Sequence, residues 1–266
     1  MIQEKLIVKE DGVIITLERN ETIVKVHKYG ATVISWKHKG RELLYVSPLA
    51  KLDGTKAIRG GIPIVFPRFG PSDLFPNQQH GFARNSRWDF SHDKDVATFT
   101  LSWEEAQFKP SGNLSLKVSI GDKGELELCL RPEFAGSEGV QYHMLLHTYF
   151  KVDLAKTHIK GLDRANYGEK QEQYEKHPPT LQVLSQISGL DRMYFDVDNP
   201  INLKDGQMEM RLESREACDV VVWNPGKEMS DVPDSDENSF VCIEHGLVSK
   251  LQTNSHALRV TYTPMI

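Results

Sequence analysis

The chain has 266 residues, 39% of them hydrophobic and 26% charged, which is ordinary for a globular protein with one large or two small domains. Its net charge of −5 argues against nucleic acid as a general partner, because phosphate backbones favour broad basic surfaces. No segment reaches the roughly 18 apolar residues of a membrane span, and residues 1–12 lack the apolar run of a signal peptide.

Alternation of apolar and polar residues, with a period near two, dominates the chain. Strands are predicted at 13–19, 22–27, 32–37, 97–103, 114–120, 125–131, 140–152, 208–213, 218–223, 240–244 and 256–263. No long stretch shows the i, i+3, i+4, i+7 stripe of an amphipathic helix. We therefore expect an all-β fold, one large antiparallel β-sandwich of more than a dozen strands that takes up residues 1–266 as a single domain.

Two polar segments interrupt this pattern. Residues 164–180 end in a Pro-Pro pair and are short enough to be a loop. Residues 227–239 carry five acids and one base and predict a solvated acidic loop; a calcium site there would require a glycine at the sixth position, which the spacing lacks.

The three cysteines, Cys129, Cys218 and Cys242, are odd in number and scattered, each within an apolar, strand-like run. This distribution is typical of buried free thiols in a reducing compartment rather than of disulfides or a metal site. It predicts a cytoplasmic protein.

Residues 56–88 invert the overall charge, since they hold five cationic residues against a single acid, Asp73. Four prolines and four glycines in the same stretch exclude a helix interior. Arg59 precedes Gly60-Gly61, whose backbone N–H groups could approach an anion closely, and arginine suits phosphate because its planar fork matches two oxygens. The stretch therefore predicts a phosphate site, although its arginines could instead be surface charges or pair with carboxylates elsewhere.

Several side chains outside these arginines have the chemistry of a sugar site. Gln79 and His80 adjoin the cationic loop and could bind a hydroxyl or transfer a proton. His143 and His147 are four apart in a strand-like run, so they would share a face; a third metal ligand is missing, and His147 could instead project into an aromatic-walled pocket. Glu244, at the end of an apolar run, would be a base if it faces a cleft, because partial desolvation raises a carboxyl pKa.

Taken together, six ordered motifs resemble a known family. They are RGG-IP-x-x-FP-x-FG, QHGFAR-x-x-x-W, LHTYF, DRMY, WNPG and VCIEHG. This set is similar to the glucose-6-phosphate 1-epimerases, a branch of the aldose 1-epimerase family, from about residue 10 to the end of the chain.

The resemblance implies a galactose-mutarotase-like fold and a cofactor-free, metal-free isomerase that interconverts the anomers of a hexose 6-phosphate, with glucose 6-phosphate as the expected substrate. It implies a small sugar phosphate as the partner, a monomer, and no role for nucleic acid or membrane. Matched residue by residue, the resemblance implies that His147 is the general acid and Glu244 the general base. It implies that Arg59, Gln79 and Arg84 bind the substrate, with the arginines at the phosphate. It also implies that Asp191 contacts a sugar hydroxyl and that His80 lines the pocket.

Three features depart from the family pattern. The stretch GLDRANYGEK lacks the expected Gly-then-Tyr-Asp sequence, so that wall of the pocket is not assigned. His245 follows Glu244 where proline is expected and could perturb the pKa of Glu244. Arg68 has no family role and is a candidate for a third phosphate contact.

Mutarotation itself requires that the C1 hydroxyl lose a proton while the ring oxygen gains one. Two groups on opposite sides of one pocket would suffice, with Glu244 starting ionised and His147 starting protonated, the latter favoured by a nearby carboxylate or the substrate phosphate. Three alternatives remain open at this stage: a mutarotase for non-phosphorylated aldoses, a non-catalytic sugar-phosphate-binding sandwich, and a glycosidase, which would need a second carboxylate such as Asp191.

Overall fold

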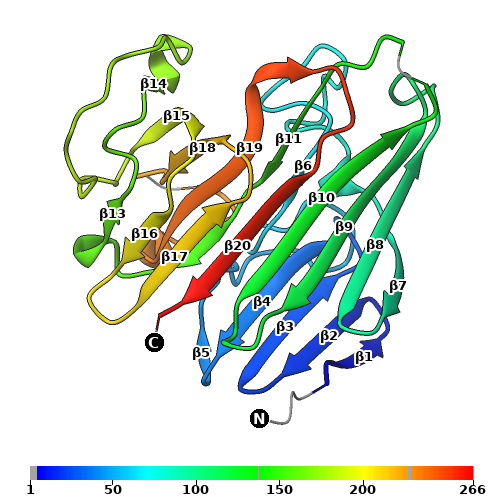
Figure 1. Ribbon diagram of the computed structural model, residues 1–266, viewed down its shortest axis with the longest axis horizontal. Coiled ribbons are helices and arrows are strands. Elements are labelled where there is room, and N and C mark those ends of the chain that lie inside the picture. Colours follow the sequence, from blue (N-terminus) through cyan, green and yellow to red (C-terminus); the bar gives the residue numbers. More distant parts are fainter. Residues whose placement is uncertain (1–4, 137, 227–228, 266) are drawn as a thin grey trace.

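The computed structural model describes residues 5–136, 138–226 and 229–265, which form three antiparallel sheets and four short 3₁₀ turns (Figure 1). The five-stranded sheet has the order β1 (Ile7–Asp11), β2 (Ile14–Arg19), β3 (Thr22–His27), β4 (Thr32–His38) and β5 (Arg41–Glu42). The eight-stranded sheet has the order β13 (His158–Lys160), β16 (Ile201–Lys204), β17 (Glu209–Ser214), β20 (Leu258–Pro264), β10 (Leu126–Phe134), β9 (Gly112–Ile120), β8 (Val96–Trp103) and β7 (Asp89–Asp93).

The seven-stranded sheet carries the site described below. Its order is β14 (Tyr167–Glu169), β15 (Asp191–Val197), β18 (Cys218–Trp223), β19 (Phe240–Gln252), β11 (Tyr142–Leu146) and β6 (Ile64–Val65), with β12 (Tyr149–Lys151) also paired to β19. The 3₁₀ turns are η1 (Ala83–Asn85), η2 (Leu154–Lys156), η3 (Lys170–Glu172) and η4 (Asp234–Asp236).

The predicted all-β antiparallel sandwich is confirmed. Two predicted strands, 22–27 and 218–223, have the same bounds as β3 and β18. The run 140–152 is two strands rather than one, and 240–244 is only the start of β19, which continues to Gln252. The predicted loop at 164–180 contains β14 and η3. Short or charge-rich strands such as β1 and β15 were not predicted, because their residues do not alternate cleanly.

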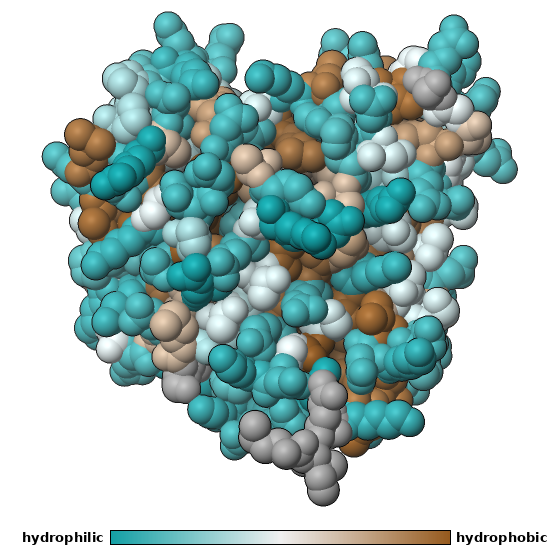
Figure 2. Space-filling model, viewed as in Figure 1, coloured by the Kyte–Doolittle hydropathy of each residue, from teal (hydrophilic) through white to brown (hydrophobic). Residues whose placement is uncertain are grey.

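One core cluster joins all three sheets. The eight-stranded sheet crosses the front of the view in Figure 1 and the other two sheets lie behind it. Leu17 of β2, Leu116 of β9 and Val220 of β18 are buried and belong to the same apolar cluster. The outer face of the molecule in this view is mostly hydrophilic (Figure 2). Alternation in each strand therefore turns one face inward, and burial of these apolar side chains drives the packing.

The seven-stranded sheet differs because both of its faces are covered. Val222 and Ile243 point into the main core, whereas their neighbours along the same strands, Trp223 and Cys242, belong to a separate cluster. Side chains point to opposite faces with a period of two, so Glu244 lies on the face of Cys242. The second face of this sheet is the floor of the site.

The cysteines and the lengths of the helices also bear on the predictions from the sequence. All three cysteines are free, as predicted; Cys218 and Cys242 are buried and Cys129 is half-buried. Among the described residues, no helix has the length and apolar character needed to span a membrane.

Candidate active site

A row of side chains crosses four strands of the seven-stranded sheet on its second face. Asp191 of β15 is opposite Trp223 of β18, Trp223 is opposite Cys242 of β19, and Cys242 is opposite Tyr149 of β12. Directly paired residues of antiparallel strands share a face, so these four side chains lie next to one another. Glu244, two residues beyond Cys242, takes the next place on the same face. Residues up to 95 positions apart are brought together by strand register alone.

His147 lies in the short break between β11 and β12. Its backbone N–H donates to the carbonyl of Pro63 at 3.0 Å, which fixes the break against the cationic loop. The imidazole stacks on the Tyr149 ring, with centroids 4.8 Å apart and planes 10° apart, and the rings of His80 and Trp223 meet it edge-on at 5.8 and 5.9 Å. Of the arrangements considered for His147, the structure thus shows the one in which it projects into an aromatic-walled pocket.

His143 does not share the site with His147. A register shift separates Tyr142 from Met144, so the simple count of four residues along one strand does not apply. His143 instead binds the loop that follows Pro67: its N–H donates to the Pro67 carbonyl at 2.8 Å, and its Nδ1 accepts from the Phe69 N–H at 3.3 Å. The histidine pair considered as metal ligands is therefore not formed.

Glu244 and His147 are in direct contact, with Oε1 and Nε2 3.4 Å apart. Their side chains are 2% and 9% exposed. Burial is the main reason that the pKa of Glu244 is raised well above its usual value, and Asp191 adds to this effect. Burial also lowers the pKa of His147, and the charges of Arg84 and Arg59 reinforce that shift. A neighbouring carboxylate was expected to raise the pKa of His147, but the net shift is downward because desolvation outweighs that effect.

These two side chains also carry free hydrogen-bonding capacity. Glu244 Oε2 and His147 Nδ1 are buried and have no hydrogen-bond partner within the described part of the chain. Buried polar atoms are nearly always paired in folded proteins. Both residues line a cavity of about 400 Å³.

Two arginines of the cationic loop line the same cavity. Arg59 donates from Nη1 to the Tyr149 hydroxyl at 2.9 Å, and its Nε and Nη2 both lie 3.0 Å from Asp231 Oδ2. Arg84 donates from Nη2 to the Gln79 carbonyl at 2.7 Å, while its buried Nε has no partner within the described residues. The structure thus brings Arg59, Gln79 and Arg84 to one wall, as predicted, although Arg59 also has the carboxylate partner that was the alternative.

The other three cations of the loop lie elsewhere. Lys56 and Arg87 are exposed and do not line the cavity. Arg68 donates to the backbone carbonyls of Pro67 and Gln141, and its guanidinium lies 5.7 Å from the centroid of the Phe108 ring. The suggestion that Arg68 adds a phosphate contact is wrong, since backbone carbonyls already hold it away from the cavity.

The Gly60-Gly61 pair does not present its backbone to the cavity. Gly60 is bridged to Val46, and the Gly61 N–H donates to the Tyr45 carbonyl at 2.7 Å. A Cβ on Gly61 would lie 2.1 Å from the Val33 carbonyl oxygen, at a φ of +69°. The predicted anion contact from these glycines is therefore wrong; they allow close approach of neighbouring backbone segments.

His80 is held as a neutral hydrogen-bond donor. Its Nδ1 accepts from the Gly70 N–H at 3.1 Å, which places the proton of a neutral ring on Nε2. Burial, and after it the charge of Arg84, lowers the pKa of His80 to about 3. His80 lines the cavity, as the sequence predicted, and it cannot serve as an acid near neutral pH.

Asp191 also lines the cavity, where it belongs to a small network. Its Oδ1 accepts from the Tyr174 hydroxyl at 2.8 Å, and its Oδ2 lies 2.8 Å from Lys170 Nζ. Lys170 and Tyr174 also line the cavity and were not predicted. They come from the polar stretch 164–180, which was predicted to be a loop because it lacks the alternation of a strand. The only available signal was the departure of GLDRANYGEK from the family pattern.

The acidic segment 227–239 contributes to the site, which the sequence did not predict. Residues 227–228 lie outside the described residues, but Asp231 holds Arg59 and Asp236 accepts from the Tyr45 hydroxyl at 3.0 Å. Met229 lines the cavity. The prediction of a wholly solvated loop is wrong, because two of its carboxylates anchor side chains around the site.

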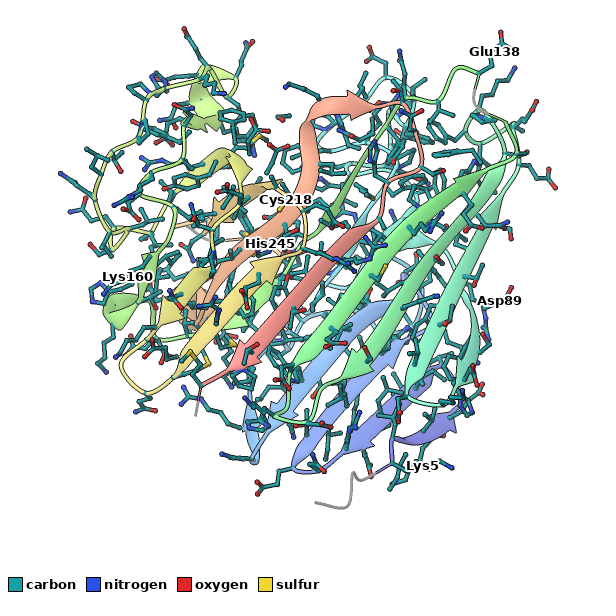
Figure 3. All side chains as sticks on the ribbon, in the orientation of Figure 1. Lys5, Asp89, Glu138, Lys160, Cys218 and His245 are labelled. Carbon is teal, nitrogen blue, oxygen red and sulfur yellow. The ribbon has the colours of Figure 1, made fainter. Side chains whose placement is uncertain are left out.

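His245 lies on the other face of β19 from Glu244, beside β18 in the interior (Figure 3). It is buried, its ring lies 5.7 Å from that of Tyr262, and burial lowers its pKa to about 4. It does not line the cavity. A neutral histidine on the opposite face adds no charge near Glu244.

A larger hollow, of about 610 Å³, lies elsewhere and includes Arg41, Lys151 and Asp205 in its lining. Its buried carboxylate is already satisfied, since Asp205 Oδ1 accepts from two backbone N–H groups and Oδ2 accepts from Arg41. The smaller cavity is lined by three residues with unpaired buried polar atoms, His147, Glu244 and Arg84, so we place the candidate active site there.

The chain is similar to sugar isomerases over most of its length. A profile described as aldose 1-epimerase matches residues 13–255. Relatives named "Putative glucose-6-phosphate 1-epimerase" include one from Cenchrus ciliaris, 31% identical over 249 residues that cover 85% of this chain and 75% of the relative. Another, from Escherichia coli, is 30% identical over 240 residues, covering 84% and 79%.

Solved structures share the fold. A crystal structure from Salmonella typhimurium, described as a "putative mutarotase", has a TM-score of 0.82 at 24% identity and covers 99% of this chain and 95% of its own. A galactose 1-epimerase from Lactobacillus acidophilus has a TM-score of 0.77 at 14% identity, covering 98% of each chain. With the profile match and the curated relatives, these findings show that the chain is an isomerase that belongs to the aldose 1-epimerase family.

Proposed function

We propose that this isomerase interconverts the α and β anomers of a hexose 6-phosphate, with glucose 6-phosphate as its substrate, by cofactor-free acid/base opening and closing of the ring. The observation that carries the proposal is a single cavity that holds the buried pair His147 and Glu244 and is lined by the arginines Arg59 and Arg84. Guanidinium groups suit phosphate, and the names of the relatives agree with a phosphorylated sugar.

The contact between His147 and Glu244 suits mutarotation better than the expected arrangement on opposite sides of a pocket. The two oxygens that exchange protons, the C1 hydroxyl and the ring oxygen, are both bonded to C1. An acid and a base whose reactive atoms lie 3.4 Å apart can therefore serve both oxygens from one side. Rotation about the C1–C2 bond of the open aldehyde then presents its other face for closure.

The pair needs to hold only one transferable proton. Ring opening moves one proton from the C1 hydroxyl to Glu244 and one from His147 to the ring oxygen, and closure reverses both transfers. The neutral pair, which burial favours in the empty site, differs from the required Glu⁻/His⁺ pair only in the position of that proton. A bound phosphate offsets the positive charges of Arg59 and Arg84, which favours the protonated form of His147.

The remaining wall residues bind the sugar in this proposal. Asp191, held by Lys170 and Tyr174, accepts from a ring hydroxyl. His80 donates from Nε2, and the exposed Gln79 contacts the phosphate end of the substrate. The free thiols of the chain support a cytoplasmic site of action.

The test is anomer exchange of glucose 6-phosphate measured by saturation-transfer NMR with and without the protein. We expect acceleration by the wild type and a loss of about 10²–10⁴-fold in each of His147→Ala and Glu244→Gln, the usual contribution of one positioned proton transfer. An unaccelerated exchange, or variants that match the wild type, would rule the proposal out.

A second candidate, mutarotation of non-phosphorylated aldoses, is favoured by one observation. Asp231 neutralises Arg59, so the phosphate wall has one uncompensated guanidinium rather than two. This candidate uses the same pair, and it predicts that free glucose or galactose exchanges faster than the phosphate ester. Comparison of the two sugars on the wild-type protein distinguishes the two candidates.

A further inference from the structure

Three possible metal ligands meet beside the cavity, which two of them, His147 and Glu244, also line. His147, Cys242 and Glu244 each offer one donor atom, and these atoms all lie within 4.8 Å of one another. Cys242 and Glu244 are two residues apart on the same face of β19, and β12, which follows His147, pairs with β19 at Cys242. The three side chains are buried, so this is not a surface cluster of solvated charges.

A second observation concerns the other hydrogen-bonding atom of two of these side chains, which takes no part in the 3.4 Å contact between His147 Nε2 and Glu244 Oε1. Glu244 Oε2 and His147 Nδ1 are buried and unpaired within the described residues. The free energy cost of an unpaired buried polar atom is about 1–3 kcal/mol, so such atoms mark places where a partner binds. The substrate is one such partner, and a cation that takes nitrogen, sulfur and oxygen donors is another.

We propose that His147, Cys242 and Glu244 form a binding site for Zn²⁺ and that the bound ion inhibits the isomerase. Zinc binds imidazole, thiolate and carboxylate at about 2.0–2.3 Å, which places tetrahedral donors roughly 3.4–3.6 Å apart. The His147–Glu244 separation of 3.4 Å already has this spacing, and the thiol needs to approach by no more than about 1 Å. On binding, the Cys242 thiol releases its proton to solvent, and the resulting thiolate and the carboxylate balance the charge of the ion.

Because His147 and Glu244 line the cavity, the fourth coordination position would face solvent or a sugar hydroxyl. Three protein ligands with one open position is the arrangement of an accessible zinc site rather than a closed structural one. Zinc would occupy lone pairs of both His147 and Glu244, so neither group could transfer a proton while the ion is bound. Inhibition thus rests on the proposed function, whereas binding does not.

Binding is tested directly by titration of the wild-type protein with Co²⁺, whose tetrahedral thiolate complexes absorb in the visible and near ultraviolet. We expect one bound ion with a thiolate-to-metal band, displacement of that band by Zn²⁺, and no effect of Mg²⁺, which prefers oxygen ligands. Glucose 6-phosphate should displace the ion as well, a measurement that requires no variant. If the protein binds Co²⁺ but does not catalyse exchange, the site stands and the proposed function fails.

The matched variants are Cys242→Ser and Cys218→Ser. Cys218 is a buried free thiol on the adjacent strand β18, outside the cluster. We expect Cys218→Ser to retain the band and Cys242→Ser to bind more than about 100-fold more weakly, since even the outer partners of metal ligands are worth roughly 10–100-fold in affinity. His147→Gln, which keeps the thiol, should also weaken binding. It therefore tests the site independently if Cys242→Ser fails to fold.

Several results would overturn the proposal. These are the absence of a thiolate band in the wild type, a band that persists in Cys242→Ser, a band lost in Cys218→Ser, or an anomer exchange rate that Zn²⁺ leaves unchanged or increases.

Discussion

A chain of contacts links the arginine wall of the cavity to His147, the proposed general acid. Asp231 lies 3.0 Å from Arg59, Arg59 donates to the Tyr149 hydroxyl at 2.9 Å, and the Tyr149 ring stacks on His147. The charge of Arg59 also lowers the pKa of His147. An anion bound at Arg59 would therefore change the electrostatic potential at His147 and the placement of its ring. In this way a phosphorylated substrate would influence the proton transfer at C1.

Arg84 is the cleaner probe of substrate choice, because within the described residues it has no carboxylate partner and its Nε is unpaired. We expect Arg84→Ala to raise the KM for glucose 6-phosphate by about 10–150-fold, since a charge-assisted hydrogen bond contributes about 1.5–3 kcal/mol. The KM for free glucose should stay unchanged. Steady-state measurement of anomer exchange with both sugars checks this.

The matched control is Arg87→Ala, which removes an exposed cation from the same loop outside the cavity. It should change neither KM. Equal losses for both sugars in Arg84→Ala would instead assign Arg84 a structural role, through its bond to the Gln79 carbonyl.

At the scale of elements, β19 and its neighbours place core and chemistry on opposite faces of one sheet. Along β19, Val241 and Ile243 enter the main core, whereas Cys242 and Glu244 lie on the second face, where Glu244 lines the cavity. A one-residue slip of register would move Glu244 into the core and an isoleucine into the cavity. The geometry of the site is thus a consequence of the pairing that also buries the core.

His143 couples β11 to the loop that carries Phe69, and this coupling predicts a pH dependence of stability. Burial lowers the pKa of His143 to about 4, from an ordinary value of 6.5. Below pH ~6.5 the unfolded chain binds a proton at His143 that the folded chain does not take up. The contribution of neutral His143 to the free energy of unfolding is therefore fully present above pH ~6.5 and is lost as the pH falls toward 4. The loss is at most about 3 kcal/mol, at about 1.4 kcal/mol per pKa unit.

Urea unfolding between pH 7 and pH 4 measures this effect. His143→Gln should flatten the fall in the free energy of unfolding relative to the wild type, because its side chain takes up no proton. His158→Gln, which alters an exposed histidine of β13, should leave the slope as it is. Identical slopes in wild type and His143→Gln would show that His143 titrates alike in the folded and unfolded chain.

At the scale of the whole molecule, aromatic rings from distant segments close the core behind the cationic loop. Phe66 is fully buried, and its ring centroid lies 5.3 Å from that of Trp103 in β8 and 5.6 Å from that of Tyr142 in β11. It also meets the rings of Phe82 and Phe108. This cluster joins the eight-stranded sheet, the seven-stranded sheet and the loop that supplies Arg59 and Arg84.

Truncation of Phe66 should therefore destabilise the fold as a whole. We expect Phe66→Ala to lower the free energy of unfolding by about 3–5 kcal/mol, a large part of the 5–15 kcal/mol that is typical of domains. Chemical denaturation at pH 7 provides the measurement. Leu74→Ala, in the same loop but 58% exposed, should change it by no more than about 0.5 kcal/mol. Similar effects of the two substitutions would contradict the central place of Phe66.

The alternation of apolar residues was sufficient to predict the all-β class, the antiparallel arrangement and most of the long strands. Strand periodicity is a local property, since it records which face of each strand is buried. The ordered motifs likewise indicated His147, Glu244, Arg59, Gln79, His80, Arg84 and Asp191, all of which line the cavity. These residues were identifiable because their side-chain chemistry stands out in otherwise apolar or proline-rich runs.

Only the tertiary structure decided which of these groups touch. The pairing of β12, β18 and β19 places Cys242 beside His147 and Glu244, and it separates His143 and His245 from them. Lys170 and Tyr174 line the cavity, and Asp231 holds Arg59 there, although all three come from polar segments that have no periodic signal. The pKa shifts of the catalytic pair also reverse the expectation for His147, because desolvation depends on burial by residues far apart in the chain. Register and burial are long-range properties, and a local pattern of residue types does not contain them.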